Sequence, residues 1–208
     1  MSSFTVATPS GPARVDLDVS KAASVLLVLG HGAGGSVDAA DLASIRDACL
    51  AADIGVARVT QPYRVAGRKA PPPAARLDEA WAAVIGALGR RAATRHLTFV
   101  YGGRSSGARV ACRAAADPAL QPAAQAVVAI AFPVHPPGKP ERSRLAELDH
   151  VPVPVLVVQG RQDPFGQPPR RRGRTMVVLD GDHGLSRSAA QVGPAVAAWL
   201  ARTLPAPG

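Results

Sequence analysis

A serine between two glycines, near the middle of this chain, is placed to act as a nucleophile. The segment reads Gly103-Arg104-Ser105-Ser106-Gly107, directly after the apolar run 97–101 and before a stretch with helical periodicity. A G-x-S-x-G sequence between a strand and a helix makes a sharp turn that holds the hydroxyl clear of the sheet. Such a serine can carry out acyl transfer. The alternatives are that Ser105 only caps the following helix, or that Ser106 is the reactive serine.

Serine acyl transfer also requires an imidazole base and a carboxylate that orients it. His183 follows the last apolar run, and Asp163 lies four residues beyond the run 153–158. With Ser105 they give the chain order serine, aspartate, histidine, each after its own expected strand. Asp163 could instead cap a helix that begins at Pro164, and His183 could be a structural residue.

Other residues of the same types are placed less well for this chemistry. Of the five histidines, His31 and His135 also follow expected strands, but His135 precedes the acid in chain order. Asp149 comes before its strand and is therefore expected at the opposite edge of the sheet. No second histidine stands at metal-ligand spacing from His183, so we expect no metal site and no cofactor.

A glycine-rich turn, His31-Gly32-Ala33-Gly34-Gly35, follows the apolar run 24–29. Its small residues predict a backbone N–H that faces the reacting carbonyl as an oxyanion donor. We expect this donor to be Ala33, with Gly34 as the alternative, and the Ser106 N–H to be the second donor. We also place His31, Gly32, Gly34 and Arg104 against the substrate. The turn lacks the G-x-G-x-x-G spacing of a dinucleotide-binding loop.

Apolar runs alternate with segments of helical periodicity along most of the chain. The expected strands are 4–7, 13–19, 24–29, 55–59, 97–101, 126–132, 153–158 and 175–179, and the expected helices are 39–52, 74–91, 108–116 and 188–204. This alternation predicts an α/β fold: a mostly parallel, twisted sheet with helices on both faces. The first two runs predict an opening antiparallel hairpin.

Two proline-rich stretches interrupt the pattern, at residues 61–73 and 135–140. Consecutive prolines end helices and cannot pair in a sheet, so both stretches are predicted loops, too short to form a lid domain. The 208 residues fit one domain over 1–204, with a frayed tail at 205–208.

The composition narrows the class of protein further. Apolar residues make up 47% of the chain, and its two cysteines, Cys49 and Cys112, lie in apolar helical patterns that predict buried free thiols. No apolar run approaches the length of a membrane span, and the first twelve residues lack the apolar core of a secretory signal. A cytoplasmic protein that does not bind membranes is expected.

The formal net charge of +9 would suit an anionic partner such as a nucleic acid or an anionic substrate. Its arginine clusters, 90–91 and 170–174, have no aromatic residues beside them in the sequence, so nucleic-acid binding is not expected. Arg104, with Arg64, Arg68 and Lys69 of the first proline-rich loop, could instead attract an anionic substrate. The alternative is that these side chains are only solvated.

The chain resembles the small, lidless, dienelactone-hydrolase-like branch of the α/β-hydrolase superfamily. The matching segments are 31–35, 102–109, 132–140, 159–166 and 181–183. The resemblance covers nearly the whole chain and implies Ser105 as nucleophile, Asp163 as acid and His183 as base. Dienelactone hydrolases themselves use cysteine as the nucleophile.

These observations predict a serine hydrolase that cleaves a carboxylic ester or related acyl bond of a small molecule through a covalent acyl-enzyme. The alternative is a catalytically inactive protein that uses the same fold as a protein-binding module. The sequence specifies no oligomeric state.

Overall fold

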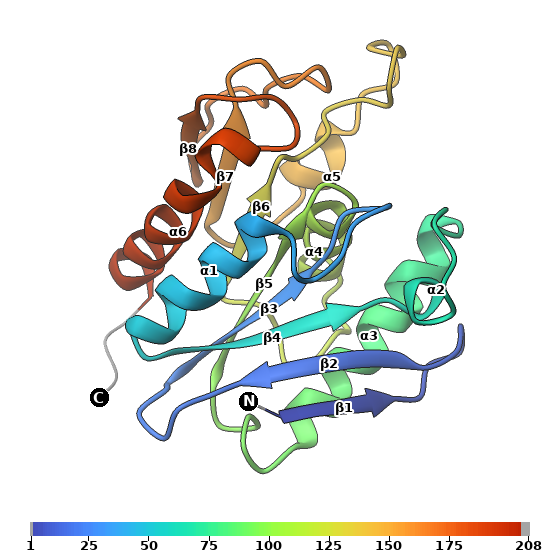
Figure 1. The fold of residues 1–208 in the computed structure, drawn as a ribbon, viewed down its shortest axis with the longest axis vertical. Helices are drawn as coiled ribbons and strands as arrows, with labels where there is room; N and C mark the ends of the chain where they lie inside the picture. Colours follow the sequence, from blue (N-terminus) through green and yellow to red (C-terminus); the bar gives the residue numbers. More distant parts are fainter. Residues whose placement is uncertain (1, 205–208) are drawn as a thin grey trace.

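The computed structural model describes residues 2–204, which build an eight-stranded sheet in the order β1-β2-β4-β3-β5-β6-β7-β8 (Figure 1). Strand β2 pairs antiparallel with both β1 and β4, and all other neighbours are parallel. The strands are β1 (Ser2–Val6), β2 (Ala13–Asp18), β3 (Val25–Gly30), β4 (Ile54–Thr60), β5 (Thr98–Arg104), β6 (Ala126–Ile130), β7 (Val155–Gly160) and β8 (Arg174–Leu179). The expected α/β class and opening hairpin are confirmed. The predicted tail at 205–208 lies outside the described residues.

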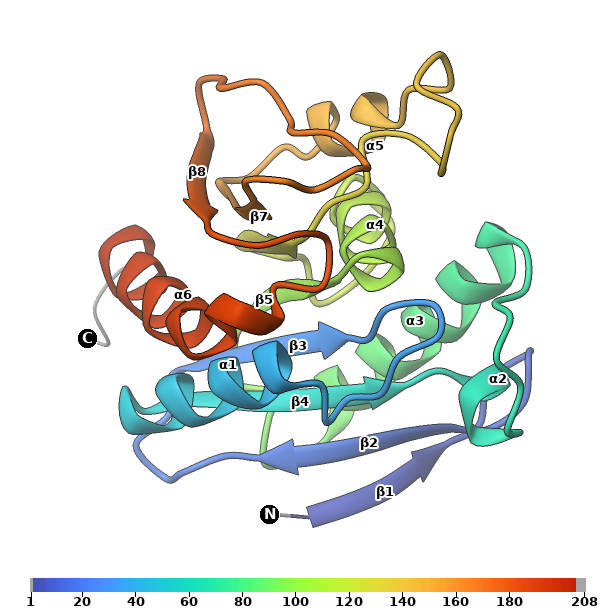
Figure 2. The same ribbon diagram turned by 45° about the horizontal axis from the view of Figure 1, so that its top comes forward.

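Helices cover both faces of the sheet, as Figures 1 and 2 show from two directions. They are α1 (Ala40–Ala51), α2 (Pro62–Val65), α3 (Ala74–Arg90), α4 (Ser106–Ala115), α5 (Leu145–Asp149) and α6 (Ala189–Thr203), the last preceded by a 3-10 turn, Ser186–Ser188. Strand β3 alternates between the two cores: Leu26 and Val28 pack with α3 and α4, whereas Leu27 and Leu29 pack with α1 and α6. A strand buried on both faces is apolar at every position, which explains the continuous run in the sequence.

Three local features differ from the expectation. The stretch 61–73 is not wholly a loop, because Pro62 begins the short helix α2, where a proline fits the first helical position. Helix α5 was not predicted, since a helix of one turn shows no periodicity. Strand β8 is an edge strand and its residues Thr175 to Leu179 are only partly covered, unlike the fully buried strands 126–130 and 155–160.

Several residues of the two arginine clusters make contacts within the protein. The Arg91 guanidinium lies 4.1 Å from the ring centre of Phe4, so this cluster does have an aromatic partner, one that β1 supplies from far away in the sequence. Arg174 is buried and paired with Asp149, which also binds Arg171 at 2.7 Å. Arg174 is thus a buried structural residue, whereas Arg91 and Arg171 make their contacts at the surface.

Candidate active site

The turn between β5 and α4 brings Ser105 into a strained backbone conformation. Its φ is 51° and its ψ is −108°, in a region that residues with a side chain rarely adopt. A Cβ at Gly103 would lie 2.6 Å from the Gly107 carbonyl carbon, and one at Gly107 would lie 2.5 Å from the Gly30 oxygen. Both positions therefore require glycine. Ser105 occupies the N-cap position of α4, but its side chain makes no capping hydrogen bond, so capping does not account for it.

The Ser105 hydroxyl meets the His183 ring instead. Ser105 Oγ lies 2.8 Å from His183 Nε2, and His183 Nδ1 lies 2.9 Å from Asp163 Oδ2. Because the carboxylate accepts the proton on Nδ1, Nε2 is left with a lone pair that can accept the hydroxyl proton. The structure thus brings together the three side chains expected to react, from turns that follow β5, β7 and β8.

The Asp163 carboxylate is held on both oxygens. Its side chain is fully buried, Oδ2 also accepts a hydrogen bond from Gln159 Nε2 at 2.8 Å, and Oδ1 accepts one from the Phe165 N–H at 2.9 Å. No helix begins at Pro164 in the described structure, so the capping alternative for Asp163 is wrong. Sequence reasoning missed Gln159; its signal is one polar residue in the otherwise apolar strand β7.

The glycine-rich turn after β3 passes directly beside the serine. A Cβ at Gly32 would lie 3.7 Å from Ser105 Cβ. The Tyr63 hydroxyl donates a 2.6 Å hydrogen bond to the Ala33 carbonyl oxygen, which holds the turn from outside. Ser106 is the first residue of α4, so its N–H has no acceptor within the helix. Ala33, Gly34 and Ser106 line the same cavity as Ser105, while their assignment as oxyanion donors stays a prediction.

His31 lies elsewhere than expected. Its ring is buried, Nδ1 donates to the Gly32 carbonyl oxygen at 2.8 Å, and Nε2 accepts from the Gln61 N–H at 3.1 Å. It does not line the cavity, so the expected substrate contact is wrong for this residue. Burial lowers the pKa of His31, with a smaller contribution from the charge of Arg64, and the neutral ring joins the glycine-rich turn to the end of β4.

Arg104 lines the cavity but its charge is already paired. Its Nε lies 2.9 Å from Asp41 Oδ2, and its Nη2 donates to the His183 carbonyl oxygen at 3.1 Å. The guanidinium therefore links the first turn of α1 to the backbone that carries the expected base. Burial raises the pKa of Asp41, against the opposing effect of the Arg104 charge. Asp41 could not be recognised from the sequence, because its partner Arg104 comes from a distant strand.

The other basic residues expected near the site lie away from it. Arg64, Arg68 and Lys69 do not line the cavity around Ser105. Arg64 donates instead to the Arg68 carbonyl oxygen at 3.1 Å. These three residues are therefore not part of the cavity wall, and their attraction of an anionic substrate stays a prediction.

The cavity around Ser105, called the Ser105 cavity below, has a volume of about 560 Å³. Its walls combine small and apolar residues with arginines: Gly32, Ala33, Gly34, Gly35, Pro71, Arg104, Ser105, Ser106, Arg109, Pro133, Pro137, Arg144, Phe165 and His183. The Phe165 ring meets the His183 ring edge to face, with ring centres 4.3 Å apart. This contact packs the imidazole from the side and leaves Nε2 to Ser105.

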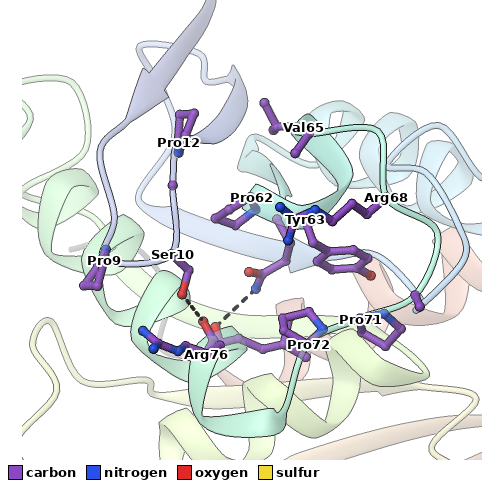
Figure 3. A pocket seen from close by; sticks show the side chains of 15 residues that line it. Pro9, Ser10, Pro12, Pro62, Tyr63, Val65, Arg68, Pro71, Pro72 and Arg76 are labelled. Atoms are coloured by element: carbon purple, nitrogen blue, oxygen red, sulfur yellow. Dashed lines mark hydrogen bonds between the residues drawn. The ribbon is translucent and has the colours of Figure 1, made fainter.

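A larger hollow of about 710 Å³ lies next to this cavity and shares Pro71 with it (Figure 3). The β1–β2 turn, α2 and the start of α3 enclose it, and its described lining contains neither a histidine nor a carboxylate. We call it the proline hollow after Pro9, Pro12, Pro62, Pro71 and Pro72.

The remaining expectations about chemistry concern the cysteines and metals. Cys49 and Cys112 are free and buried, which confirms the predicted buried free thiols, and burial raises the pKa of each to about 12. Within residues 2–204 no three His, Cys, Asp or Glu side chains gather as a metal would require. Across the same range, no helix has the length and hydropathy of a membrane span.

Fold and site together define an α/β hydrolase. The chain belongs to the α/β-hydrolase family: the family model for an alpha/beta hydrolase domain matches residues 23–195. No curated protein matches the sequence.

Many solved structures share this fold. An α/β serine hydrolase without a lid from Xanthomonas campestris aligns at 24% identity with a TM-score of 0.77, covering 100% of this chain and 96% of that one. A dienelactone hydrolase from Anabaena variabilis aligns at 18% identity and 0.76, covering 98% of both chains. Est1E from Butyrivibrio proteoclasticus, solved with ferulic acid bound, aligns at 16% and 0.75, covering 96% of this chain and 98% of that one. These similarities establish a lidless α/β-hydrolase fold.

Proposed function

We propose that this protein is a serine hydrolase that cleaves a carboxylic ester or related acyl bond of a small molecule, with Ser105 as nucleophile. One observation carries the proposal: the unbroken hydrogen-bonded chain from Ser105 Oγ through the His183 ring to the buried Asp163 carboxylate. The strained backbone at Ser105 supports it, because such strain accompanies functional sites more often than purely structural turns.

In the proposed acylation step, His183 Nε2 removes the hydroxyl proton as Ser105 Oγ attacks the substrate carbonyl carbon. The negative charge that develops on the carbonyl oxygen is bound by the N–H groups of Ala33 and Ser106. A single donor of this kind lowers the barrier by about 3 kcal/mol. The tetrahedral intermediate collapses as the protonated imidazole returns its proton to the leaving alcohol oxygen.

Deacylation repeats the same steps with water in place of the serine. His183 Nε2 removes a proton from a water molecule, whose oxygen attacks the acyl carbon, and the carboxylic acid leaves as Ser105 regains its proton. Throughout, the buried Asp163 carboxylate stabilises the positive charge that appears on the ring. The whole cycle uses side chains and amides of this chain, without a cofactor.

The experiment that tests the proposal measures hydrolysis of p-nitrophenyl esters from acetate to octanoate. We expect turnover of at least one ester by the wild type and loss of about 10⁶-fold in kcat, down to the background rate, for Ser105→Ala. Ser106→Ala is the matched control, since its N–H is retained and its hydroxyl has no proposed role. Absence of turnover in the wild type, or equal turnover by Ser105→Ala, would leave the alternative of a non-catalytic protein-binding module.

A further inference from the structure

Three arginines line the Ser105 cavity, and their charges are compensated to different degrees. Arg104 is paired with Asp41, as described above. Arg109, on α4, binds Glu147 of α5 through two nitrogens, with Nε 2.8 Å from Oε2. Arg144 makes no ion pair or side-chain hydrogen bond with any residue in the range 2–204. Among the three cavity arginines, Arg144 is the one that forms no ion pair within the part of the chain that the structure describes.

Glu147, the carboxylate whose charge acts on Arg144, already binds other arginines. Glu147 Oε2 also lies 3.1 Å from Arg113 Nη1, and Arg113 binds Asp78 through two further contacts of 2.7 and 2.9 Å. Two carboxylates therefore face three guanidinium groups, counting Arg144, and one positive charge is left over. Burial lowers the pKa of Arg144, the charges of Arg109 and Arg113 lower it further, and the charge of the Glu147 carboxylate opposes them.

Arg144 is held in place by its backbone. Its N–H donates to the Val134 carbonyl oxygen at 2.7 Å, directly before α5 begins. The loop that this bond closes also supplies Pro133 and Pro137 to the cavity wall, and Phe165 adds an aromatic face. The cavity thus offers an apolar surface beside the nucleophile and one unpaired guanidinium on the same wall.

We propose that Arg144 binds a carboxylate carried by the substrate, so that the Ser105 site prefers esters whose acyl chain ends in a negative charge. This inference rests on the proposed function. A guanidinium presents paired donors that match the two oxygens of a carboxylate, and a partly desolvated site strengthens the contact. The sequence suggested that Arg104, Arg64, Arg68 and Lys69 attract an anionic substrate. We assign the binding of the substrate carboxylate to Arg144 instead.

Two p-nitrophenyl esters of equal chain length test the proposal: the neutral valerate and the glutarate half-ester, which ends in a carboxylate. In the wild type we expect a higher kcat/KM for the half-ester. Arg144→Gln should lower the kcat/KM of the half-ester by about 10- to 100-fold, the usual range for a lost charged hydrogen bond, and leave the valerate unchanged. Arg142→Gln is the matched control, since that side chain is 68% exposed on the same loop, and neither ester should respond.

A binding measurement separates failure of this inference from failure of the proposed function. Calorimetric titration of Ser105→Ala with monomethyl glutarate needs no turnover, and adding Arg144→Gln should weaken the affinity by a similar factor. If valerate is hydrolysed but the half-ester is not preferred, or Arg144→Gln affects both esters equally, the inference is wrong and the hydrolase proposal stands. If neither ester is hydrolysed, the calorimetric comparison alone decides, and equal affinities overturn the inference.

Discussion

The Ser105 cavity and the proline hollow are neighbours of unequal size, and the smaller one holds the reactive groups. The proline hollow has about 710 Å³ against about 560 Å³, and the two share Pro71. In the Ser105 cavity a serine, an imidazole and a buried carboxylate form one hydrogen-bonded chain. In the proline hollow, Tyr63 turns its hydroxyl to the Ala33 carbonyl oxygen, toward the glycine-rich turn.

The difference lies in the elements beneath each hollow. The Ser105 cavity stands over the carboxyl ends of β3, β5 and β8, where parallel strands direct their following turns to one edge of the sheet. The proline hollow lies between the β1–β2 turn, α2 and α3, and its polar lining, which includes Ser10, Gln61 and Arg76, contains neither a histidine nor a carboxylate. A site is thus recognised by polar groups that converge, and volume alone does not identify it.

The largest expected difference in kcat is between Asp163→Asn, at the Ser105 site, and a substitution in the proline hollow. When the amide NH2 faces Nδ1 it donates a hydrogen bond there, which favours the tautomer protonated on Nε2. Nε2 can then no longer accept the hydroxyl proton, and kcat for ester hydrolysis should fall by about 10⁴-fold. Val65→Ser, in the proline hollow and 43% exposed, should leave kcat unchanged. Circular dichroism verifies that both variants are folded. A comparable loss in both, or no loss in Asp163→Asn, contradicts the functional distinction between the hollows.

Arg104→Met should have an intermediate effect, seen in stability. The Asp41 carboxyl, 3% exposed, would lose its cation, and urea unfolding should show a loss of about 2–4 kcal/mol. Adding Asp41→Asn removes the unpaired charge, so the double variant should be more stable than Arg104→Met alone. Arg68→Met in the proline hollow should change stability by less than about 0.5 kcal/mol. If the double variant is less stable than Arg104→Met, the unpaired Asp41 charge does not cause the loss of stability, and the prediction is wrong.

The smallest expected effect is on the pH dependence of stability, through His31, which joins the glycine-rich turn to the end of β4. Because burial holds the pKa of His31 in the folded state below its ordinary 6.5, the unfolded chain binds the proton first as the pH falls. This contribution to stability is complete above about pH 6.5 and declines below it, as protonated Nε2 can no longer accept from the Gln61 N–H. Thermal unfolding at pH 7.5 and 5.5 should show a smaller acid destabilisation in His31→Asn than in the wild type. Equal destabilisation of the wild type and His31→Asn would show that protonation of His31 does not contribute to the loss of stability at acid pH.

Residues fixed by local backbone demands were predictable from sequence. Gly103, Ser105 and Gly107 form a turn that only this pattern of glycines permits, and the order of Asp163 and His183 after their strands placed both at the same edge. The sheet followed for the same reason, since continuous apolar runs require cover on both faces.

Roles that depend on partners from distant segments were not predictable. Arg104 is next to the nucleophile in the sequence, but its charge is neutralised by an ion pair with Asp41 of α1. Arg144 is one arginine among many in the sequence, and only the sharing of Glu147 between Arg109 and Arg113 leaves it unpaired. Pairing across the fold is a property of the packed structure, and local sequence does not encode it.

The most direct test of the central claim is the mass of the intact protein after reaction with a fluorophosphonate, followed by peptide mapping. A serine activated by His183 should carry one phosphonyl group per chain, on Ser105, and Ser105→Ala should carry none. An unmodified wild type, or a modification mapped to Ser106, would contradict the account.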